Sequence, residues 1–273
     1  MKIFHTPQEL QEYRKTCQGS VGFVPTMGAL HNGHISLIKK SVVENEQTIV
    51  SIFVNPTQFL ATEDLSKYPK RTQADLKICS LANVDAVFMP EVQSIYFPLE
   101  PTIVAPFSKA YILEGLSRAG HFDGVLRVVL KLFNLTRPDR AYFGKKDAQQ
   151  LYLIQNMVKT LFLPIDIIAC DIIREEDGLA LSSRNIYLSN EEKKDALLIS
   201  KSLKIASKTI MSGERKTKEI AKAMRETLLP LHVEYVEILS REFEPLESIE
   251  IGNTIILVAV KVGTTRLIDN IWI

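Results

Sequence analysis

Two histidines, His31 and His34, lie three residues apart in the stretch Phe23–Leu37, together with Gly28 and Gly33. If a helix begins here, this spacing puts both imidazole rings on one side of its first turn. The first turn of a helix presents backbone N–H groups, and the helix dipole favours an anion at that end. The stretch therefore predicts a phosphate-binding corner, in which backbone N–H groups and two imidazoles donate hydrogen bonds to one polyphosphate.

Two other roles for these histidines are open from their types alone. Loop histidines often only bond to backbone carbonyls, and paired histidines can also ligate zinc. A zinc site fits poorly, because no third His or Cys lies close in the sequence. The apolar segment before the histidines, the glycines and the helix pattern after them favour the phosphate site.

The elements that must position this corner alternate between short apolar runs and helical patterns. Apolar runs that are continuous, with no polar residue at every second position, are typical of parallel strands covered on both faces. The segment 91–120 predicts loops because it contains several prolines, with residues 102–105 as an edge strand. The predicted strands are 21–25, 48–54, 86–90, 140–143 and 165–171, and the predicted helices are 7–15, 33–42, 72–82, 122–135 and 147–162. This alternation predicts an α/β fold with a doubly wound, Rossmann-like parallel sheet and right-handed crossovers.

After residue 173 the pattern changes to two helices followed by strands. The capping box Ser189–Glu192 opens a helix that runs to about Met211. The remaining predicted elements are a helix at 217–229 and strands at 233–239 and 254–262. We therefore expect a smaller α+β C-terminal domain, with a boundary in the polar connection Glu175–Gly178, which gives domains 1–175 and 176–273.

Composition excludes several classes of function. The 33 basic and 32 acidic residues leave a net charge of +1, which argues against nucleic acid or an anionic membrane as the main partner. The three cysteines lack a CxxC pattern, which argues against a disulfide framework and a dithiol centre and favours a reducing cytoplasm. No apolar stretch is long enough for a signal peptide core or a membrane span. We expect a soluble cytoplasmic protein that acts on small molecules.

Further polar residues follow the predicted strands. Asn55 and Gln58 come after the second buried strand, at the sheet edge where open α/β folds bind ligands, and a glutamine can both donate to and accept from a hydroxy acid. The alternative is that both residues only cap the loop. Lys145 and Lys146 lie where a helix begins, which is unfavourable for cations unless an anion binds there. A solvated lysine pair is the alternative.

Beyond the predicted boundary, Ser182, Ser183 and Arg184 combine two hydroxyls with a forked guanidinium. These groups suit a triphosphate, and the loop could close over a ligand held by the first domain. An ordinary surface loop is the alternative.

The spacing His-x-Gly-His after a strand-to-helix turn is the signature of the nucleotidyltransferase superfamily, which includes the class I aminoacyl-tRNA synthetases. The longer string Pro25–His34 resembles the pantoate–β-alanine ligase family. Five later segments resemble that family in the same order: Ser51–Phe59, Arg118–Val125, Phe143–Leu151, Gly178–Asn185 and Thr265–Asn270. The departures are Ala119 in place of the usual Pro, Lys145 where Glu is common and Ala148 where an aromatic residue is common.

The resemblance implies ATP-dependent ligation of pantoate and β-alanine to pantothenate through a pantoyl-adenylate, with release of AMP and pyrophosphate. It implies catalytic roles for His34, His31, Lys146 and Arg184. The ATP-binding residues that it implies are Met27, Gly28, Ala29, Leu30, His31, Asn32, Gly33, His34, Gly144, Lys145, Lys146, Asp147, Ile173, Leu181, Ser182, Ser183 and Arg184.

For the other substrates, the resemblance implies that Gln58, Gln150 and Asn55 bind pantoate and that Gln58 also lies near β-alanine. It further implies a homodimer formed through the first domain. We expect Mg²⁺ to be held mostly by phosphate oxygens and waters, with Asp75 as a candidate protein ligand. No residue stands out as a base for the β-alanine amine, so positioning and exclusion of water must dominate that step.

Two alternatives remain open from the sequence. Another nucleotidyltransferase, such as a cytidylyltransferase or a pantetheine-phosphate adenylyltransferase, would share the two histidines but would not need the paired Gln58 and Gln150. The other alternative is not an enzyme but a Rossmann-type module that senses a nucleotide and whose second domain binds a protein partner.

Overall fold

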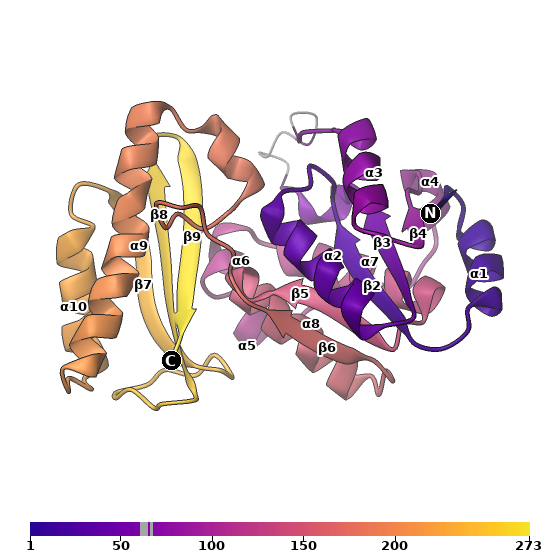
Figure 1. Ribbon diagram of the computed structural model, residues 1–273. Helices are drawn as coiled ribbons and strands as arrows, with labels where there is room; N and C mark the ends of the chain where they lie inside the picture. Colours follow the sequence, from indigo (N-terminus) through magenta and orange to yellow (C-terminus); the bar gives the residue numbers. More distant parts are fainter. Residues whose placement is uncertain (61–64, 66–67) are drawn as a thin grey trace. The chain divides into compact units, whose positions relative to one another are not determined.

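The computed structural model describes residues 1–60, 65 and 68–273, and the chain divides into two compact units (Figure 1). The first unit comprises Met1–Lys145 and Gln149–Asp171, and the second comprises Lys146–Ala148 and Ile172–Ile273. The sequence predicts one boundary near residue 175. In the structure the second unit begins at Ile172 and also includes the short segment Lys146–Ala148.

Within the described residues, the first unit is built on a six-stranded parallel sheet with the order β1-β4-β3-β2-β5-β6. The strands are β1 (Lys2–Phe4), β2 (Val21–Thr26), β3 (Gln47–Ile52), β4 (Ala86–Phe88), β5 (Arg140–Gly144) and β6 (Asp166–Cys170). The chain moves outward from β2 through β3 and β4, and then returns to add β5 on the other side of β2. Ligands of open α/β sheets bind at such a reversal, beyond the carboxyl ends of the strands.

The helices of this unit follow their strands closely. They are α1 (Pro7–Thr16), α2 (Asn32–Glu44), α3 (Thr72–Leu81), α7 (His121–Thr136) and α8 (Ala148–Thr160), with the short helices α4 (Val92–Ile95), α5 (Phe107–Ala110) and α6 (Glu114–Ser117). Helix α2 packs tightly on β2, because a Cβ at Gly22 would lie 2.2 Å from Ser41 Oγ. Side chains from both elements, among them Val24 and Ile38, are fully buried in one core cluster. Helix α2, which carries the two histidines, is thereby fixed to the strand that precedes them.

In this unit one predicted strand is absent from the described residues and one strand was not predicted. Residues 102–105, predicted as an edge strand, form no strand in the structure, and the backbone N–H of Ala105 instead donates to Asp123 Oδ1 at 2.7 Å. A side-chain acceptor thus replaces a strand partner in this proline-flanked segment. Strand β1, which the sequence did not predict, is only three residues long and carries too little pattern to detect.

The second unit packs helices on an antiparallel sheet, as predicted for an α+β domain. Its described strands follow the order β7-β8-β9 and comprise His232–Ser240, Thr254–Val262 and Thr265–Trp272. Helices α9 (Asn190–Met211) and α10 (Thr217–Thr227) contribute Ile199, Leu203, Ile220 and Met224 to a core shared with the sheet. The capping box is confirmed, since Ser189 N donates to Glu192 Oε2 at 2.8 Å and Glu192 N donates to Ser189 Oγ at 3.2 Å. Strand β9 was not predicted.

Across the part of the chain that the structure describes, none of the helices combines the length and the apolar character that crossing a bilayer requires.

Candidate active site

The rings of the two histidines cap the start of helix α2 by accepting hydrogen bonds from backbone N–H groups. His31 is the N-cap residue, and its Nδ1 accepts from Gly33 N at 3.1 Å. His34 Nδ1 accepts in turn from His31 N at 3.3 Å, and the two ring centroids are 4.1 Å apart. Because each Nδ1 is an acceptor, a neutral ring carries its proton on Nε2. Both imidazoles therefore hold a defined tautomer at the start of the helix.

The glycine between the histidines is required by this geometry. A Cβ at Gly33 would lie 2.9 Å from Cε1 and 3.0 Å from Nδ1 of His31, which is closer than the ring could tolerate without moving. The role of this glycine is thus to make room for the capping ring of His31.

The loop before the histidines is anchored by a carboxylate. Asp75 of α3 is 2% exposed, and its two oxygens accept from Ala29 N at 2.9 Å and from Leu30 N at 2.8 Å. Gly28 has a φ of +85°, and a Cβ there would lie 3.0 Å from Asp75 Oδ2. Ala29 adopts a φ of +51°, which a non-glycine residue takes only under local constraint.

These contacts correct one part of the phosphate prediction. The backbone N–H groups of Ala29 and Leu30 point at Asp75, and that of Gly28 donates to Thr26 Oγ1 at 3.2 Å. The N–H groups of His31 and Gly33 are used in the cap. Five backbone N–H groups of this corner are therefore engaged within the protein.

Asp75 holds the loop before the histidines in place, a role that the sequence did not predict. The sequence made it a candidate ligand for Mg²⁺, but both of its oxygens accept backbone N–H groups from the loop. Among the residues that the structure describes, no three His, Cys, Asp or Glu side chains come together in a metal-binding cluster.

Gln58 is the polar residue that the structure brings beside this corner. It lies at the end of the 3₁₀ turn Pro56–Gln58 after β3, and its Nε2 donates to the sulfur of Met27 at 3.2 Å. Its Oε1 accepts from Asn55 Nδ2 at 2.9 Å. The amide of Gln58 is thereby oriented with its N–H₂ group toward the loop of the histidines.

Asn55 holds Gln58 in place. It is 1% exposed, and besides Gln58 its Nδ2 donates to Gly124 O at 3.1 Å. Its Oδ1 accepts from Tyr96 OH at 2.6 Å and from Thr57 Oγ1 at 3.0 Å. These contacts use both the oxygen and the N–H₂ group of the Asn55 amide, so Asn55 positions Gln58. The geometry of Asn55 is that of a residue that caps the loop.

The backbone of Gln58 is held by the segment that follows Arg118. His121 Nδ1 donates to Gln58 O at 2.8 Å, while Arg118 lies within 2.9 Å of His121 Nε2. A guanidinium only donates, so His121 Nε2 is the acceptor and its proton is on Nδ1. A Cβ at Gly124 would lie 2.2 Å from Thr57 O, which shows how closely α7 packs on this turn.

The two adjacent glutamines at the start of helix α8 have different surroundings. Gln149 is 2% exposed, donates to Lys109 O at 2.8 Å and Ile112 O at 2.9 Å, and accepts from Glu114 N at 3.1 Å. Its amide is fully used in holding the loop before α7. Gln150 is half-buried and is the glutamine that the sequence selected for pantoate.

The two lysines have different surroundings. Lys145 Nζ contacts Asp171 Oδ1 at 2.6 Å, and this hydrogen bond and charge lower the pKa of Asp171. Lys146 belongs to the second unit, where its Nζ lies 3.7 Å from Asp147 Oδ1 and its carbonyl accepts from Asn270 Nδ2 at 2.7 Å. The segment Gly144–Asp147 is therefore divided between the two units, which no sequence pattern indicates.

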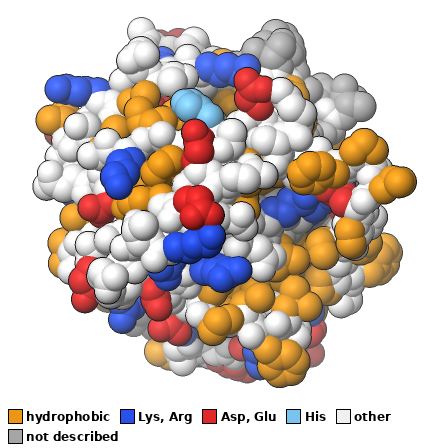
Figure 2. All heavy atoms as spheres, turned by 90° about the vertical axis from the view of Figure 1, so that its right-hand side faces the viewer, with side chains coloured by type: hydrophobic (Ala, Val, Ile, Leu, Met, Phe, Trp, Pro, Cys, Tyr) orange, Lys and Arg blue, Asp and Glu red, His pale blue; other side chains and the backbone are white. Residues whose placement is uncertain are grey.

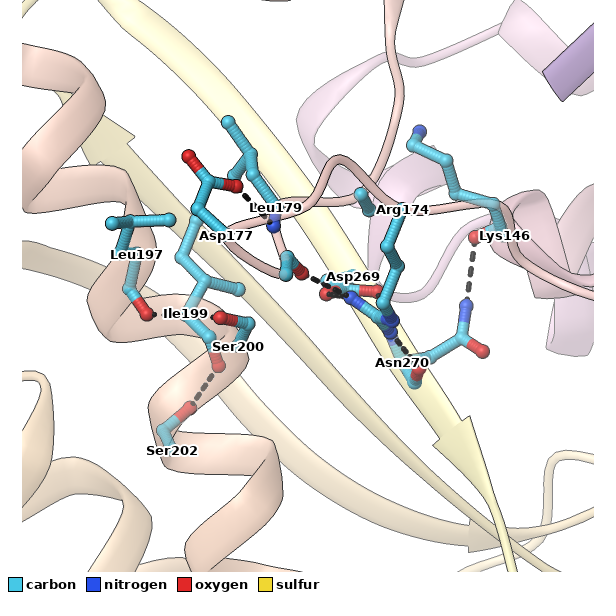
Figure 3. A network of polar contacts seen from close by, with 12 residues as sticks. Lys146, Arg174, Asp177, Leu179, Leu197, Ile199, Ser200, Ser202, Asp269 and Asn270 are labelled. Atoms are coloured by element: carbon cyan, nitrogen blue, oxygen red, sulfur yellow. Dashed lines mark hydrogen bonds and ion pairs between the residues drawn. The ribbon is translucent and has the colours of Figure 1, made fainter. Parts of the chain in front are cut away.

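The serine loop is built within the second unit. Ser182 Oγ accepts from Arg184 N at 3.2 Å and caps the 3₁₀ turn Ser183–Tyr187, which leaves the Arg184 side chain exposed. Upstream, Leu181 N donates to Ile173 O at 3.0 Å, so these two predicted site residues close the base of one loop. Figure 3 shows the polar contacts that tie this loop and Lys146 to strand β9.

Comparison with known proteins decides between the candidate families. The family described as pantoate-beta-alanine ligase matches residues 2–272. The chain belongs to the pantoate–β-alanine ligase family. This assignment confirms the resemblance of the sequence motifs and makes the chain a ligase, and it disfavours both the nucleotide sensor and the other nucleotidyltransferases.

Individual members of the pantoate–β-alanine ligase family are similar over the full length. A pantothenate synthetase of Aliarcobacter butzleri is 62% identical over 273 residues, which is all of both chains. The crystal structure of a Thermus thermophilus pantothenate synthetase is 38% identical, with a TM-score of 0.94 and 99% coverage of each chain. A Francisella tularensis pantoate-beta-alanine ligase, complexed with beta-gamma ATP and beta-alanine, is 38% identical, with a TM-score of 0.83 and coverage of 100% of this chain and 97% of its own.

Proposed function

We propose that this chain joins pantoate and β-alanine to form pantothenate, in a reaction driven by conversion of ATP to AMP and pyrophosphate. The observation that carries the proposal is the meeting of two loops at the carboxyl edge of the sheet. Met27, from the loop that leads to His31 and His34, contacts the amide of Gln58, whose orientation Asn55 fixes. A hydrogen-bond donor for a hydroxy acid thereby contacts the loop that leads to the imidazoles suited to phosphate.

In the first step, a carboxylate oxygen of pantoate bonds to the α-phosphorus of ATP. The bond from that phosphorus to the bridging oxygen breaks, and pyrophosphate leaves. Negative charge grows on the leaving oxygens, where hydrogen-bond donors lower the barrier. We assign His34 Nε2–H as the main donor and His31 as its assistant, because the cap fixes the proton of each ring on Nε2.

The second unit supplies further cationic and hydroxyl groups. We assign Lys146, Ser182, Ser183 and Arg184 to the phosphates, with Asp147 accepting from the ribose hydroxyls. Gly144, Lys145, Ile173, Leu181 and the loop 27–33 would complete the ATP site. A bound Mg²⁺ would neutralise phosphate charge and would be held by phosphate oxygens and waters.

In the second step, the neutral amine of β-alanine attacks the acyl carbon of the pantoyl-adenylate. The bond from that carbon to the phosphate oxygen breaks, AMP leaves, and the amine loses a proton to form the amide. Gln58 and Gln150 would hold the pantoyl group, and Gln58 would lie near β-alanine. We expect positioning and exclusion of water to dominate this step.

A pyrophosphate-release assay tests the proposal. ATP and pantoate should yield pyrophosphate only to the extent that adenylate accumulates, and addition of β-alanine should give continuous turnover with equal amounts of AMP and pantothenate by mass spectrometry. Pyrophosphate release that needs CTP, or a phosphorylated alcohol in place of pantoate, would point to another nucleotidyltransferase instead.

We further propose a cytoplasmic homodimer. The cytoplasmic assignment rests on the three cysteines, all of which are free thiols. The dimer proposal rests on apolar side chains exposed in the first unit between α4 and α6. These include Phe97 at 60%, Leu99 at 98% and Phe107 at 78% exposure. Figure 2 shows a face of this unit on which hydrophobic side chains gather.

Light scattering after gel filtration tests the dimer. The expected mass is twice the chain mass of 30.8 kDa. The double variant Leu99→Lys, Phe107→Lys should shift the mass toward one chain, whereas Val43→Lys, which changes an apolar residue that is 84% exposed on α2, should not. A wild-type protein that remains monomeric at all concentrations would contradict this part of the proposal.

A further inference from the structure

Strand β9 places two buried polar residues side by side where an apolar core would be expected. Asp269 is 4% exposed and Asn270 is 1% exposed. Buried polar groups are retained at little cost only when their hydrogen bonds are satisfied. The proposed reaction gives neither residue a direct part, although both lie in the Thr265–Asn270 segment that resembles the family.

The side-chain amide of Asn270 is oriented by Trp272. The indole Nε1 of Trp272 donates to Asn270 Oδ1 at 2.9 Å. An indole N–H only donates, so the atom that faces it must be the carbonyl oxygen of the amide. The Nδ2 group of Asn270 is thereby directed to Lys146, where it donates to the backbone carbonyl at 2.7 Å.

This contact fixes Lys146 through its backbone. In Figure 3 the carbonyl of Lys146 faces Asn270, and the side chain points away from Asn270. The bond joins residues 124 positions apart in the sequence, and Lys146–Ala148 are the residues of this part of the chain that group with the second unit. Asn270 therefore fixes the backbone position in the second unit from which the Lys146 side chain extends.

The neighbouring Asp269 anchors the other phosphate segment to the same strand. Its carboxylate forms a two-point contact with Arg174, at 2.6 Å and 3.0 Å. Arg174 also donates to Gly178 O at 3.1 Å, within the loop that leads to Ser182. Adjacent residues of β9 thus hold both the Lys146 turn and the base of the serine loop (Figure 3).

We propose that Asn270 is a positioning residue for ATP use, which holds Lys146 so that its ammonium group meets the phosphates. The inference rests on the proposed function, in which Lys146 binds phosphate. Asn270 does not touch the substrate in this account. Its loss should therefore affect ATP use through Lys146 and leave the use of pantoate unchanged.

The test compares Asn270→Ala, Lys146→Ala and the double variant by pyrophosphate release at saturating pantoate. Removing the donor leaves the carbonyl of half-buried Lys146 without this hydrogen bond, so Asn270→Ala should lower kcat/KM for ATP by about tenfold or more with an unchanged KM for pantoate. The double variant should be no worse than Lys146→Ala alone, because Asn270 acts through that residue. The control is Asn253→Ala, which removes an amide from a turn of the same unit.

A second variant covers the case in which Asn270→Ala does not fold. Asn270→Asp keeps the side-chain size but sets an anionic oxygen against the Lys146 carbonyl. Its activity relative to wild type should recover as the pH is lowered, because a protonated carboxyl can donate to that carbonyl. A purely structural role would not produce this recovery.

Three results would overturn the inference: an unchanged kcat/KM for ATP in Asn270→Ala, effects that multiply in the double variant, or a pH-independent activity ratio for Asn270→Asp. A wild-type chain that releases no pyrophosphate with pantoate would instead contradict the proposed function itself.

Discussion

The carboxylate of Asp75 binds the backbone N–H groups of Ala29 and Leu30 at 2.9 Å and 2.8 Å, and so fixes the loop that leads to His31. In Asp75→Asn one of these N–H groups loses its acceptor and faces an amide N–H₂ group instead. We expect a cost of about 1–3 kcal/mol and a loss of about tenfold or more in kcat/KM for ATP. Thermal melting and pyrophosphate release measure the two effects.

The response of this variant to Mg²⁺ separates positioning from metal binding. If Asp75 only positions the loop, excess Mg²⁺ will not restore the activity of Asp75→Asn. Recovery at high Mg²⁺ would mean that Asp75 is a metal ligand, as the sequence alone suggested. The matched control is Asp139→Asn, because Asp139 Oδ2 accepts from Val21 N at 2.7 Å at the opposite end of strand β2.

The two nitrogens of His34 have separable tasks. Nδ1 accepts from His31 N and so stabilises the helix start, whereas Nε2–H is assigned to phosphate. Asn at this position can supply an acceptor near Nδ1, and Gln can place an amide N–H₂ near Nε2. We expect His34→Asn to keep the melting temperature and lose activity by orders of magnitude, and His34→Gln to keep more activity with a lower melting temperature.

His34→Ala serves as the reference that lacks both groups. Adenylate formation, measured as pyrophosphate released in a single turnover, reports the donor, and thermal melting reports the cap. Equal activity in the Asn and Gln variants would argue that His34 contributes through its cap and not as a phosphate donor.

The elements around the site were largely predictable because local patterns determine them. The apolar run of β2, the helix pattern of α2 and the capping box of α9 each combine a local preference with burial, and the structure confirms all three. Strands β1 and β9 were not predicted, for two different reasons. Strand β1 is too short to show a pattern, and β9 alternates buried and half-buried residues with polar Asp269 and Asn270 inside.

The candidate site was less predictable in its supporting residues. His31, His34 and Gln58 follow strand ends, where a motif can be recognised. The residues that hold them, Asp75 and Asn55, have partners that depend on how distant segments pack, and Tyr96 lies 41 positions from the asparagine that it binds. Motifs in the sequence therefore indicate candidate residues at strand ends, whereas the contacts by which the buried Asp75 anchors the loop could not be predicted.

The buried thiols provide a test of the packing of the first unit. Burial raises the pKa of Cys79 to about 12 and the pKa of Cys170 to about 11, against an ordinary value of 9.0. Both thiols should therefore stay protonated at pH 8 and react slowly with Ellman's reagent until the protein unfolds. Fast labelling of either thiol in the native protein would contradict the packing.

The same shifts predict a loss of stability in alkali. The folded state binds these protons more tightly than the unfolded state, so their contribution is fully present below pH 9.0 and declines as the pH rises toward 11. Urea melts at pH 8 and pH 10 should show a lower free energy of unfolding at pH 10. Cys170→Ala should reduce this difference, because it removes one of the titrating groups.

Tyr96 fixes the orientation of the Gln58 amide through Asn55. Burial raises the pKa of the Tyr96 hydroxyl, which stays protonated and donates to Asn55 Oδ1 at 2.6 Å. That contact fixes Asn55 so that its Nδ2 faces Gln58 Oε1, and Gln58 then presents its own N–H₂ group. Tyr96→Phe removes the hydroxyl and keeps the ring. We expect the KM for pantoate to rise by about five- to tenfold, in line with about 1 kcal/mol for a lost hydrogen bond, with the KM for ATP unchanged.

A double-mutant cycle shows whether the effect passes through Gln58. If Gln58 binds pantoate, Gln58→Ala alone should raise the KM for pantoate strongly, and adding Tyr96→Phe should then change little. The matched control is Tyr13→Phe, since Tyr13 OH donates to Gln47 Oε1 at 3.0 Å near the start of β3, the end of that strand opposite to Asn55 and Gln58. Should Tyr96→Phe weaken pantoate and ATP use equally, or add fully to Gln58→Ala, the hydroxyl would have only a general structural role.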